Sequence, residues 1–117
     1  MKGVMIIFQP TRGDDGPPEE VIELTAPPPL EDLQQRIGGY IQPVPHLKTI
    51  EVCGGVYQCV AFCNEEGKFK QMPFNRRATE LWRLAIERET EHEVHMRDIL
   101  VGPLVVIVGD DELLGNL

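Results

Sequence analysis

Five polar or aromatic residues of the types that recognise small anions are the first candidates for chemistry. Asn64 and Glu65 stand at one turn, and Asn75 and Arg76 follow a second turn. Arginine offers a rigid fork of donors for phosphate or carboxylate, and asparagine both donates and accepts. Tyr40 adds a ring that can stack on a ligand. Two interpretations stay open: these residues converge on a ligand, or they supply turn chemistry and an internal Glu–Arg ion pair.

The histidines give no comparable pattern. His92 and His95 lie three residues apart, which is not the His-Glu-x-x-His spacing of zinc hydrolases, and their segment is highly polar. No nucleophile elbow, Walker loop or dinucleotide-binding glycine motif is present in the sequence. We therefore assign no catalytic residue, no metal ligand and no cofactor.

The three cysteines, Cys53, Cys59 and Cys63, are odd in number, which favours free thiols in a reducing compartment. Cys59 and Cys63 share one face of a predicted strand. Free cysteine usually behaves as a small buried hydrophobe. We expect all three to be reduced, buried and structural.

The candidate corner needs a strand and two turns to position it. Residues 57–63 are apolar and β-favouring and predict a central strand. The Asn-Glu-Glu-Gly sequence at 64–67 predicts a hairpin turn with glycine in a left-handed conformation. A short return strand, 68–72, would then end at Pro73, which has no N–H for a ladder. Asn75 stands where a helix N-cap belongs.

The N-terminal half predicts two strands, a helix and an extended segment. Residues 3–8 are apolar on both faces, which is typical of an interior strand. A Pro- and Gly-rich loop, about 9–18, is expected to be mobile, and a second, antiparallel strand follows at 20–25. The apolar spacing predicts a helix over 30–37 that ends at a Gly-Gly pair. Prolines within 40–45 indicate a short edge strand.

The C-terminal half predicts two more strands and a longer helix. Residues 49–53 should join the central strand through a Gly-Gly hairpin. A helical segment, about 75–96, should pack through one apolar face. That face consists of Ala78, Leu81, Trp82 and Ala85. The last strand, within 98–109, should bend at Gly102, and the acidic tail from Asp110 should fray.

These elements predict one α+β domain over 1–117: a mostly antiparallel sheet of about five or six strands with one or two packed helices. Apolar content is 42% and charged content 26%, which is ordinary for a globular protein. The apolar runs are too short to span a membrane or to form a signal-peptide core, so we expect a cytoplasmic protein and no membrane partner. A net charge of -8 argues against direct nucleic-acid binding.

Four short motifs together resemble a known family. They are Gly-Gly-Tyr-Ile at 38–41, Cys-Asn-Glu-Glu-Gly-Lys at 63–68, Pro-Phe-Asn-Arg at 73–76 and Asp-Ile-Leu-Val-Gly at 98–102. Their order and approximate spacing are similar to those of a small phage- and plasmid-associated domain, domain of unknown function 3846. A longer loop at 9–18 and an insertion at 77–96 depart from the usual pattern. The resemblance implies an intracellular accessory protein of a mobile element and transfers no activity, catalytic residue or cofactor.

We therefore expect a non-enzymatic binding protein that engages a host protein or captures a small anionic or nucleotide ligand. Such a protein could serve a phage by countering host defence. Alternatives are a small enzyme acting on a nucleotide or phosphorylated metabolite at the Asn64/Arg76 corner, an acidic DNA mimic, and an oligomer-forming structural module. Self-association into a homo-oligomer is compatible with each of these.

Overall fold

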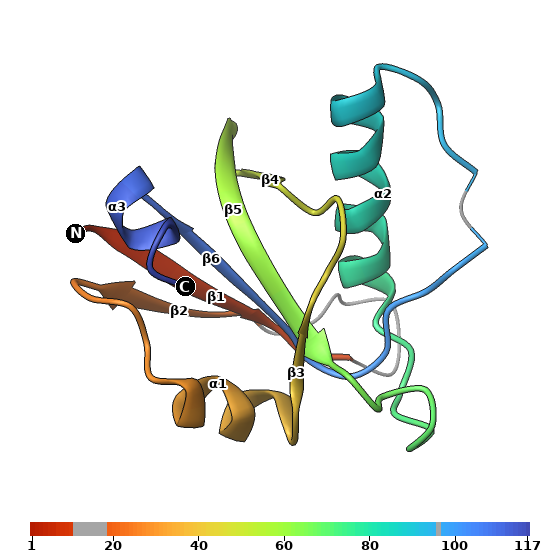
Figure 1. Cartoon of the computed structure of the whole chain (residues 1–117). Coiled ribbons are helices and arrows are strands. Elements are labelled where there is room, and N and C mark those ends of the chain that lie inside the picture. The colour runs from red at the N-terminus through yellow and green to blue at the C-terminus, as the bar shows by residue number, and fades with distance from the viewer. Residues whose placement is uncertain (11–18, 96) are drawn as a thin grey trace.

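The computed structural model describes residues 1–10, 19–95 and 97–117, and its framework is a six-stranded antiparallel sheet with helices on both faces (Figure 1). In chain order the elements are β1 (Gly3–Phe8), β2 (Glu19–Leu24), α1 (Leu30–Ile37), β3 (Ile41–Pro43), β4 (Thr49–Val52), β5 (Gly55–Asn64), α2 (Arg76–Thr90), β6 (Leu104–Gly109) and α3 (Asp111–Leu114). The strands lie in the order β2-β1-β6-β5-β3, and β4 pairs with β5. The predicted α+β class is confirmed.

Strand β1 is interior, as its apolar sequence predicts. It pairs antiparallel with β2 on one side and with β6 on the other. Ile6 and Phe8 face the core beneath α2, whereas Met5 and Ile7 face the core beneath α1 and α3. A strand that is covered on both faces needs apolar residues at successive positions rather than at alternate ones.

Helix α2 covers one face of the sheet (Figure 1). The Asn75 side chain accepts a hydrogen bond from the backbone N–H of Ala78, which makes Asn75 the predicted N-cap. Ala78, Trp82 and Ala85 are buried, and Leu81 packs against the same core. The predicted docking face is therefore confirmed, whereas the predicted extent to about 96 is wrong because the helix ends at Thr90.

Helix α1 lies on the opposite face and buries Leu33 and Ile37. It ends at Gly38, whose φ of 86° gives the left-handed C-cap that the Gly-Gly pair predicts. Strand β3 follows as a short strand at the end of the strand order. The Gly54 hairpin between β4 and β5 is confirmed as well.

The C-terminal tail was predicted to fray, and that prediction is wrong. Residues Asp111–Leu114 form α3, and Leu113 is fully buried against the sheet. The Asp110 carboxylate accepts hydrogen bonds from the backbone N–H groups of Leu113 and Lys2. Burial of one leucine and a capped helix start tie the tail to the N-terminus.

The return strand predicted over 68–72 is also wrong, and so is the hairpin at 64–67. Residues 65–71 form consecutive turns, in which Lys70 N–H bonds to the Glu66 carbonyl and Met72 N–H to the Gly67 carbonyl. These local bonds use the donors that a ladder would need. The chain then crosses to the segment before β6, where Phe74 forms a single bridge with Val101.

Most of the loop predicted at 9–18 lies outside the described residues. Among the residues that are described, none of the helices is long and apolar enough to cross a membrane.

Candidate functional site: a groove beside an exposed aromatic loop

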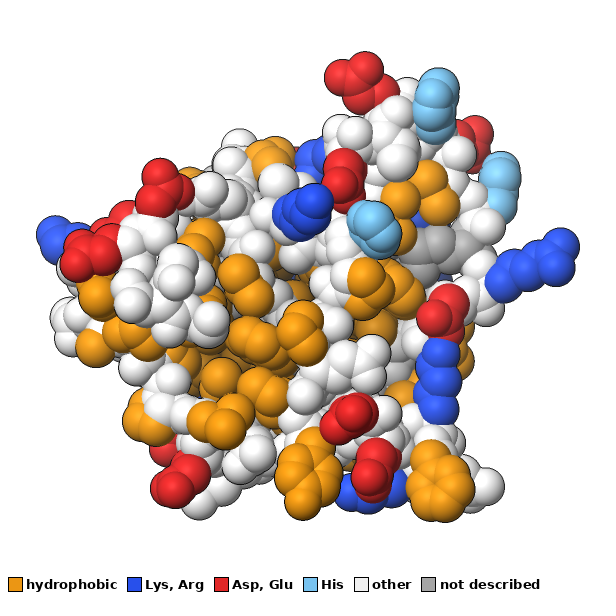
Figure 2. Space-filling model, in the orientation of Figure 1, with side chains coloured by type: hydrophobic (Ala, Val, Ile, Leu, Met, Phe, Trp, Pro, Cys, Tyr) orange, Lys and Arg blue, Asp and Glu red, His pale blue; other side chains and the backbone are white. Residues whose placement is uncertain are grey.

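A groove of about 200 Å³ opens where the end of β5 meets the segment that leads into β6. Buried apolar side chains of Val44, Trp82 and Leu100 form its floor. Its rim is polar and comes from Gln42, Glu65, Lys68 and Asp98, with Ile99 and Phe69 beside them. In Figure 2, orange, red and blue side chains meet in this part of the surface, at the lower right. An apolar floor with a charged rim is typical of a binding site.

Turn residues 65–71, here called the display loop, project beyond the sheet (Figure 1). Met72 anchors this loop by packing between two glycines. A Cβ at Gly102 would lie 2.9 Å from the Met72 sulfur, and a Cβ at Gly67 would lie 3.0 Å from Val101 Cγ2. Gly102 also has a φ of 72°. A side chain at Gly67 would therefore crowd Val101, whereas Gly102 is favoured above all by its left-handed backbone conformation.

Phe69 is the most exposed large hydrophobic residue among the described ones, at 89%. It lies at the rim of the groove, between Lys68 and Lys70. The Lys68 ammonium forms an ion pair with Asp98, which ties the display loop to the segment across the groove. An aromatic side chain held in water on an anchored loop forgoes the stabilisation that burial would give.

Asp98 is a carboxylate at neutral pH. The hydrogen bond from Lys68 holds the pKa of Asp98 below its usual range, and the backbone N–H of Ile99 acts in the same direction. Glu65 adds a second exposed acid at the rim. The charges of Lys68 and Asp98 meet each other, so Glu65 leaves the rim with a small net negative charge.

The thiol in the groove is a poor nucleophile. Cys63 is half-buried, and burial raises its pKa, partly offset by Lys68. A raised pKa keeps the thiol protonated at neutral pH, whereas catalysis requires the thiolate. Cys59 is buried as predicted, and burial raises its pKa to about 12. Cys53 is exposed at the β4–β5 turn and Cys63 is only half-buried, so the prediction that all three cysteines are buried is right for Cys59 alone.

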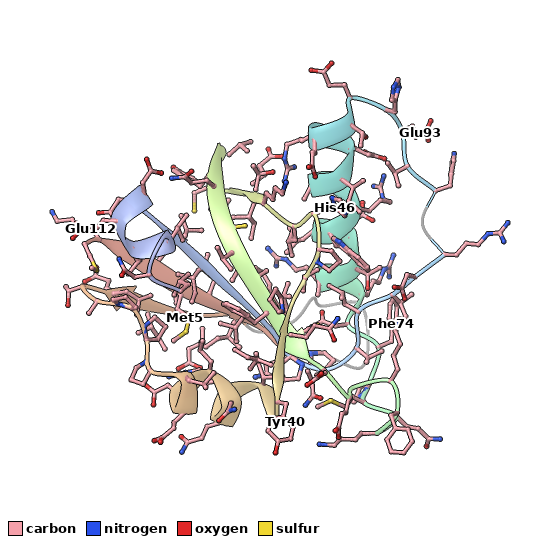
Figure 3. All side chains as sticks on the ribbon, in the orientation of Figure 1. Met5, Tyr40, His46, Phe74, Glu93 and Glu112 are labelled. Atoms are coloured by element: carbon pink, nitrogen blue, oxygen red, sulfur yellow. The ribbon has the colours of Figure 1, made fainter. Side chains whose placement is uncertain are left out.

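The structure brings three of the five predicted site residues together. The Glu65 N–H donates to the Tyr40 carbonyl at 2.9 Å, and Asn64 pairs with Ile41 in the β3–β5 ladder. Asn64 and Glu65 line the groove, whereas Tyr40 lies outside its lining. Figure 3 shows Tyr40 beyond the end of β3, pointing away from the body of the protein.

The Asn64 side-chain amide forms its hydrogen bonds within the protein. Its Nδ2 donates to the Ile37 carbonyl at 3.3 Å, and its Oδ1 accepts from the Glu66 N–H at 2.8 Å. The amide thus joins the end of α1 to the start of the display loop. These bonds agree with the interpretation in which Asn64 supplies turn chemistry rather than a ligand contact.

Asn75 and Arg76 stand at a different junction, and neither lines the groove. The fully buried Asn75 amide donates to the carbonyls of Phe8 and Gly102, both at 2.9 Å. Arg76 is exposed at the first turn of α2, where it lowers the pKa of Glu80 after the larger effect of Arg83. An ion pair from Arg76 to Glu65 is not among the interactions found in the described residues.

Sequence reasoning missed the rim residues Lys68, Phe69 and Asp98. Phe69 was assigned to the return strand, where alternation would have buried it. The available signal was the sequence Lys-Phe-Lys within a turn, because an aromatic residue between two charges in a turn has no core to enter. The histidine pair took no part: His95 is exposed, and within the described segments no cluster of three or more metal-ligating side chains occurs.

The fold and the groove define a small α+β protein with an apolar recess beside an anchored, exposed aromatic loop. The family model described as Domain of unknown function (DUF3846) matches residues 11–114, and the chain belongs to that family. No curated protein and no solved structure matches the chain.

Proposed function

We propose that this is a non-enzymatic binding protein whose groove receives an apolar side chain, flanked by basic residues, from a partner protein. The observation that carries the proposal is the apolar floor of Val44, Trp82 and Leu100 inside an acidic rim. Apolar anchors surrounded by polar rims are the usual anatomy of protein–protein contacts.

The size of the groove favours a side chain over a whole small molecule. Its volume is about 200 Å³, whereas pockets for drug-sized ligands and cofactors are usually about 300–1,000 Å³. A groove of this size can enclose one aromatic or aliphatic side chain, and the rest of the partner would lie across the rim.

Charge argues against a nucleotide or other small anion. The Lys68 ammonium already faces Asp98, and an anion would have to displace that carboxylate. Arg76, the residue best suited to phosphate, does not line the groove. The net charge of -8 would repel anions and steer a basic partner toward the protein.

The biological setting is part of the same proposal. We place the protein in the cytoplasm of a host cell, where it would act for a phage or plasmid by engaging a host protein, with counter-defence as the role. Support comes from the motif resemblance at 63–68 and 73–76 and from the predicted free thiols.

The test uses Trp82 as a reporter, because it is the single tryptophan of the chain and lies in the groove floor. Its indole N–H donates to the Pro45 carbonyl at 2.7 Å, so an occupant should change its emission. Dilute protein is titrated with capped pentapeptides centred on Lys-Phe-Lys, Glu-Phe-Glu and Lys-Ser-Lys. We expect a saturable change with the first peptide alone.

Two charge-reversed variants provide the control. Asp98→Lys should abolish the response to the Lys-Phe-Lys peptide, whereas Glu112→Lys makes the same charge change at a distant helix and should leave it intact (Figure 3). A response equal for all three peptides, or unchanged in Asp98→Lys, would contradict the proposal. A saturable response to adenosine triphosphate would favour nucleotide capture instead.

A further inference from the structure

The chain itself carries the side-chain pattern that we propose for the occupant of its groove. Lys68, Phe69 and Lys70 present an exposed aromatic residue between two basic ones. We propose that the display loop of a second copy occupies the groove, so that two molecules pair by exchanging Phe69. This inference rests on the proposed function, because it names a partner for the same groove.

A side chain and its receiving groove on one surface are self-complementary. Phe69 lies at the rim of the groove of its own molecule. A two-fold axis near that rim would carry each Phe69 over the other molecule's groove, which gives two identical contacts and a closed dimer. The apolar floor around Trp82 then covers a ring that is 89% exposed in the single molecule.

The charges of this surface also complement themselves. The display loop carries Glu65 and Glu66 as well as Lys68 and Lys70, and Asp98 faces it across the groove. Lys70 contacts Glu66 at 3.6 Å with both side chains about half exposed, so this pair can exchange partners at little cost. Local charge is thus nearly balanced although the whole chain carries -8. The repulsion between two molecules that meet on this face is therefore weaker than their net charge suggests.

The contact is small, and this sets its strength. One ring and the residues at the rim bury far less than the roughly 800 Å² per partner of a standard stable interface. We therefore expect association at high protein concentration, in roughly the 50–500 µM range, and monomers at low micromolar concentration.

Sedimentation equilibrium from roughly 5 to 500 µM tests the pairing. The wild type should rise from the monomer mass toward twice that mass, and Phe69→Ser should stay monomeric with an unchanged melting temperature. Tyr40→Ser removes another exposed aromatic residue, outside the groove lining, and should dimerise like the wild type. A wild type that stays monomeric, or a dimer that survives in Phe69→Ser, overturns the proposal.

Photo-crosslinking identifies the groove directly. Benzoylphenylalanine at position 69, in a mixture of ¹⁴N- and ¹⁵N-labelled protein, should give mixed-isotope adducts with residues 98–101 of the other molecule. Adducts confined to one chain or to other surfaces overturn the exchange. The wild type could stay monomeric while the Lys-Phe-Lys peptide still changes Trp82 emission. That result would exclude a second copy as the partner and would leave the proposed function standing. Failure of both experiments removes both.

Discussion

Asn75 and Phe69 lie close in sequence and carry opposite tasks. Asn75 is fully buried and its amide makes three hydrogen bonds, to Phe8, Gly102 and Ala78. Phe69 is 89% exposed and lies beside the groove. Asn75, which the sequence suggested as a ligand-binding residue, stabilises the fold. Phe69, which the sequence placed in a strand, faces solvent. Residue type alone misassigns both, because the environment decides which task each side chain performs.

The difference follows from what each position must satisfy. The ends of β1 and α2 and the segment around Gly102 leave backbone groups that need partners inside the protein, and one amide meets three of them. The display loop satisfies its backbone through its own turns, so its side chains are free to face outward. Loss of Asn75 should therefore cost stability, whereas loss of Phe69 should cost binding.

Trp82 belongs to both regions and should show the largest effect. It is buried in the core beneath α2 and also forms part of the groove floor. Trp82→Ala should lower the free energy of unfolding by about 3 kcal/mol or more, because a large cavity remains. Urea denaturation followed by circular dichroism measures this. Tyr57→Ala, at an exposed aromatic residue on β5, should cost far less. A loss below about 1 kcal/mol in Trp82→Ala would mean that α2 is a surface appendage.

Asn75→Ala should show the next largest effect. The change removes a helix cap and leaves the buried carbonyls of Phe8 and Gly102 without this donor, so we expect a loss of about 2–3 kcal/mol. The same urea denaturation gives the value. Asn116→Ala serves as the control, since Asn116 is exposed and its amide donates only to the Glu112 carbonyl. A loss below about 1 kcal/mol in Asn75→Ala would mean that the Asn75 side chain contributes little to the stability of the fold.

Cys59 should make the protein sensitive to alkali. Burial raises the pKa of the thiol to about 12, from 9.0 in the unfolded chain. Above pH 9 the unfolded state loses this proton while the native state keeps it, so stability falls as pH rises, by about 2 kcal/mol near pH 10.5. Cys59→Ala should flatten this fall, and Cys53→Ala, at an exposed thiol, should not. Identical pH profiles in the two variants would exclude Cys59 as the cause.

Local sequence patterns predicted most of the fold. Alternation and apolar runs predicted β1, β4 and β5, and capping residues predicted the C-terminal end of α1 and the start of α2. Such patterns succeed because burial on one or two faces dictates residue type directly. The tail failed because Leu113 is buried against the sheet beside Gly3 of β1, which lies at the other end of the sequence.

The candidate site was predicted only in part. Glu65 and Asn64 do line the groove, but Lys68 and Asp98 are 30 residues apart and meet only because the chain crosses back beside Val101. Gly67 and Gly102 have the residue type of turn glycines, and the sequence does not show that a side chain at Gly67 would crowd Val101. Long-range packing of this kind produces no regular spacing of apolar residues in the sequence, so sequence patterns cannot predict it.

The stability of Phe69→Ser tests most directly whether the display loop serves binding rather than folding. Urea unfolding of Phe69→Ser and the wild type, both in dilute monomeric solution, should give free energies that agree within about 0.5 kcal/mol, because the ring is exposed. A loss above about 1.5 kcal/mol would mean that Phe69 packs within its own molecule. Such a result would contradict its role as the side chain offered to a partner.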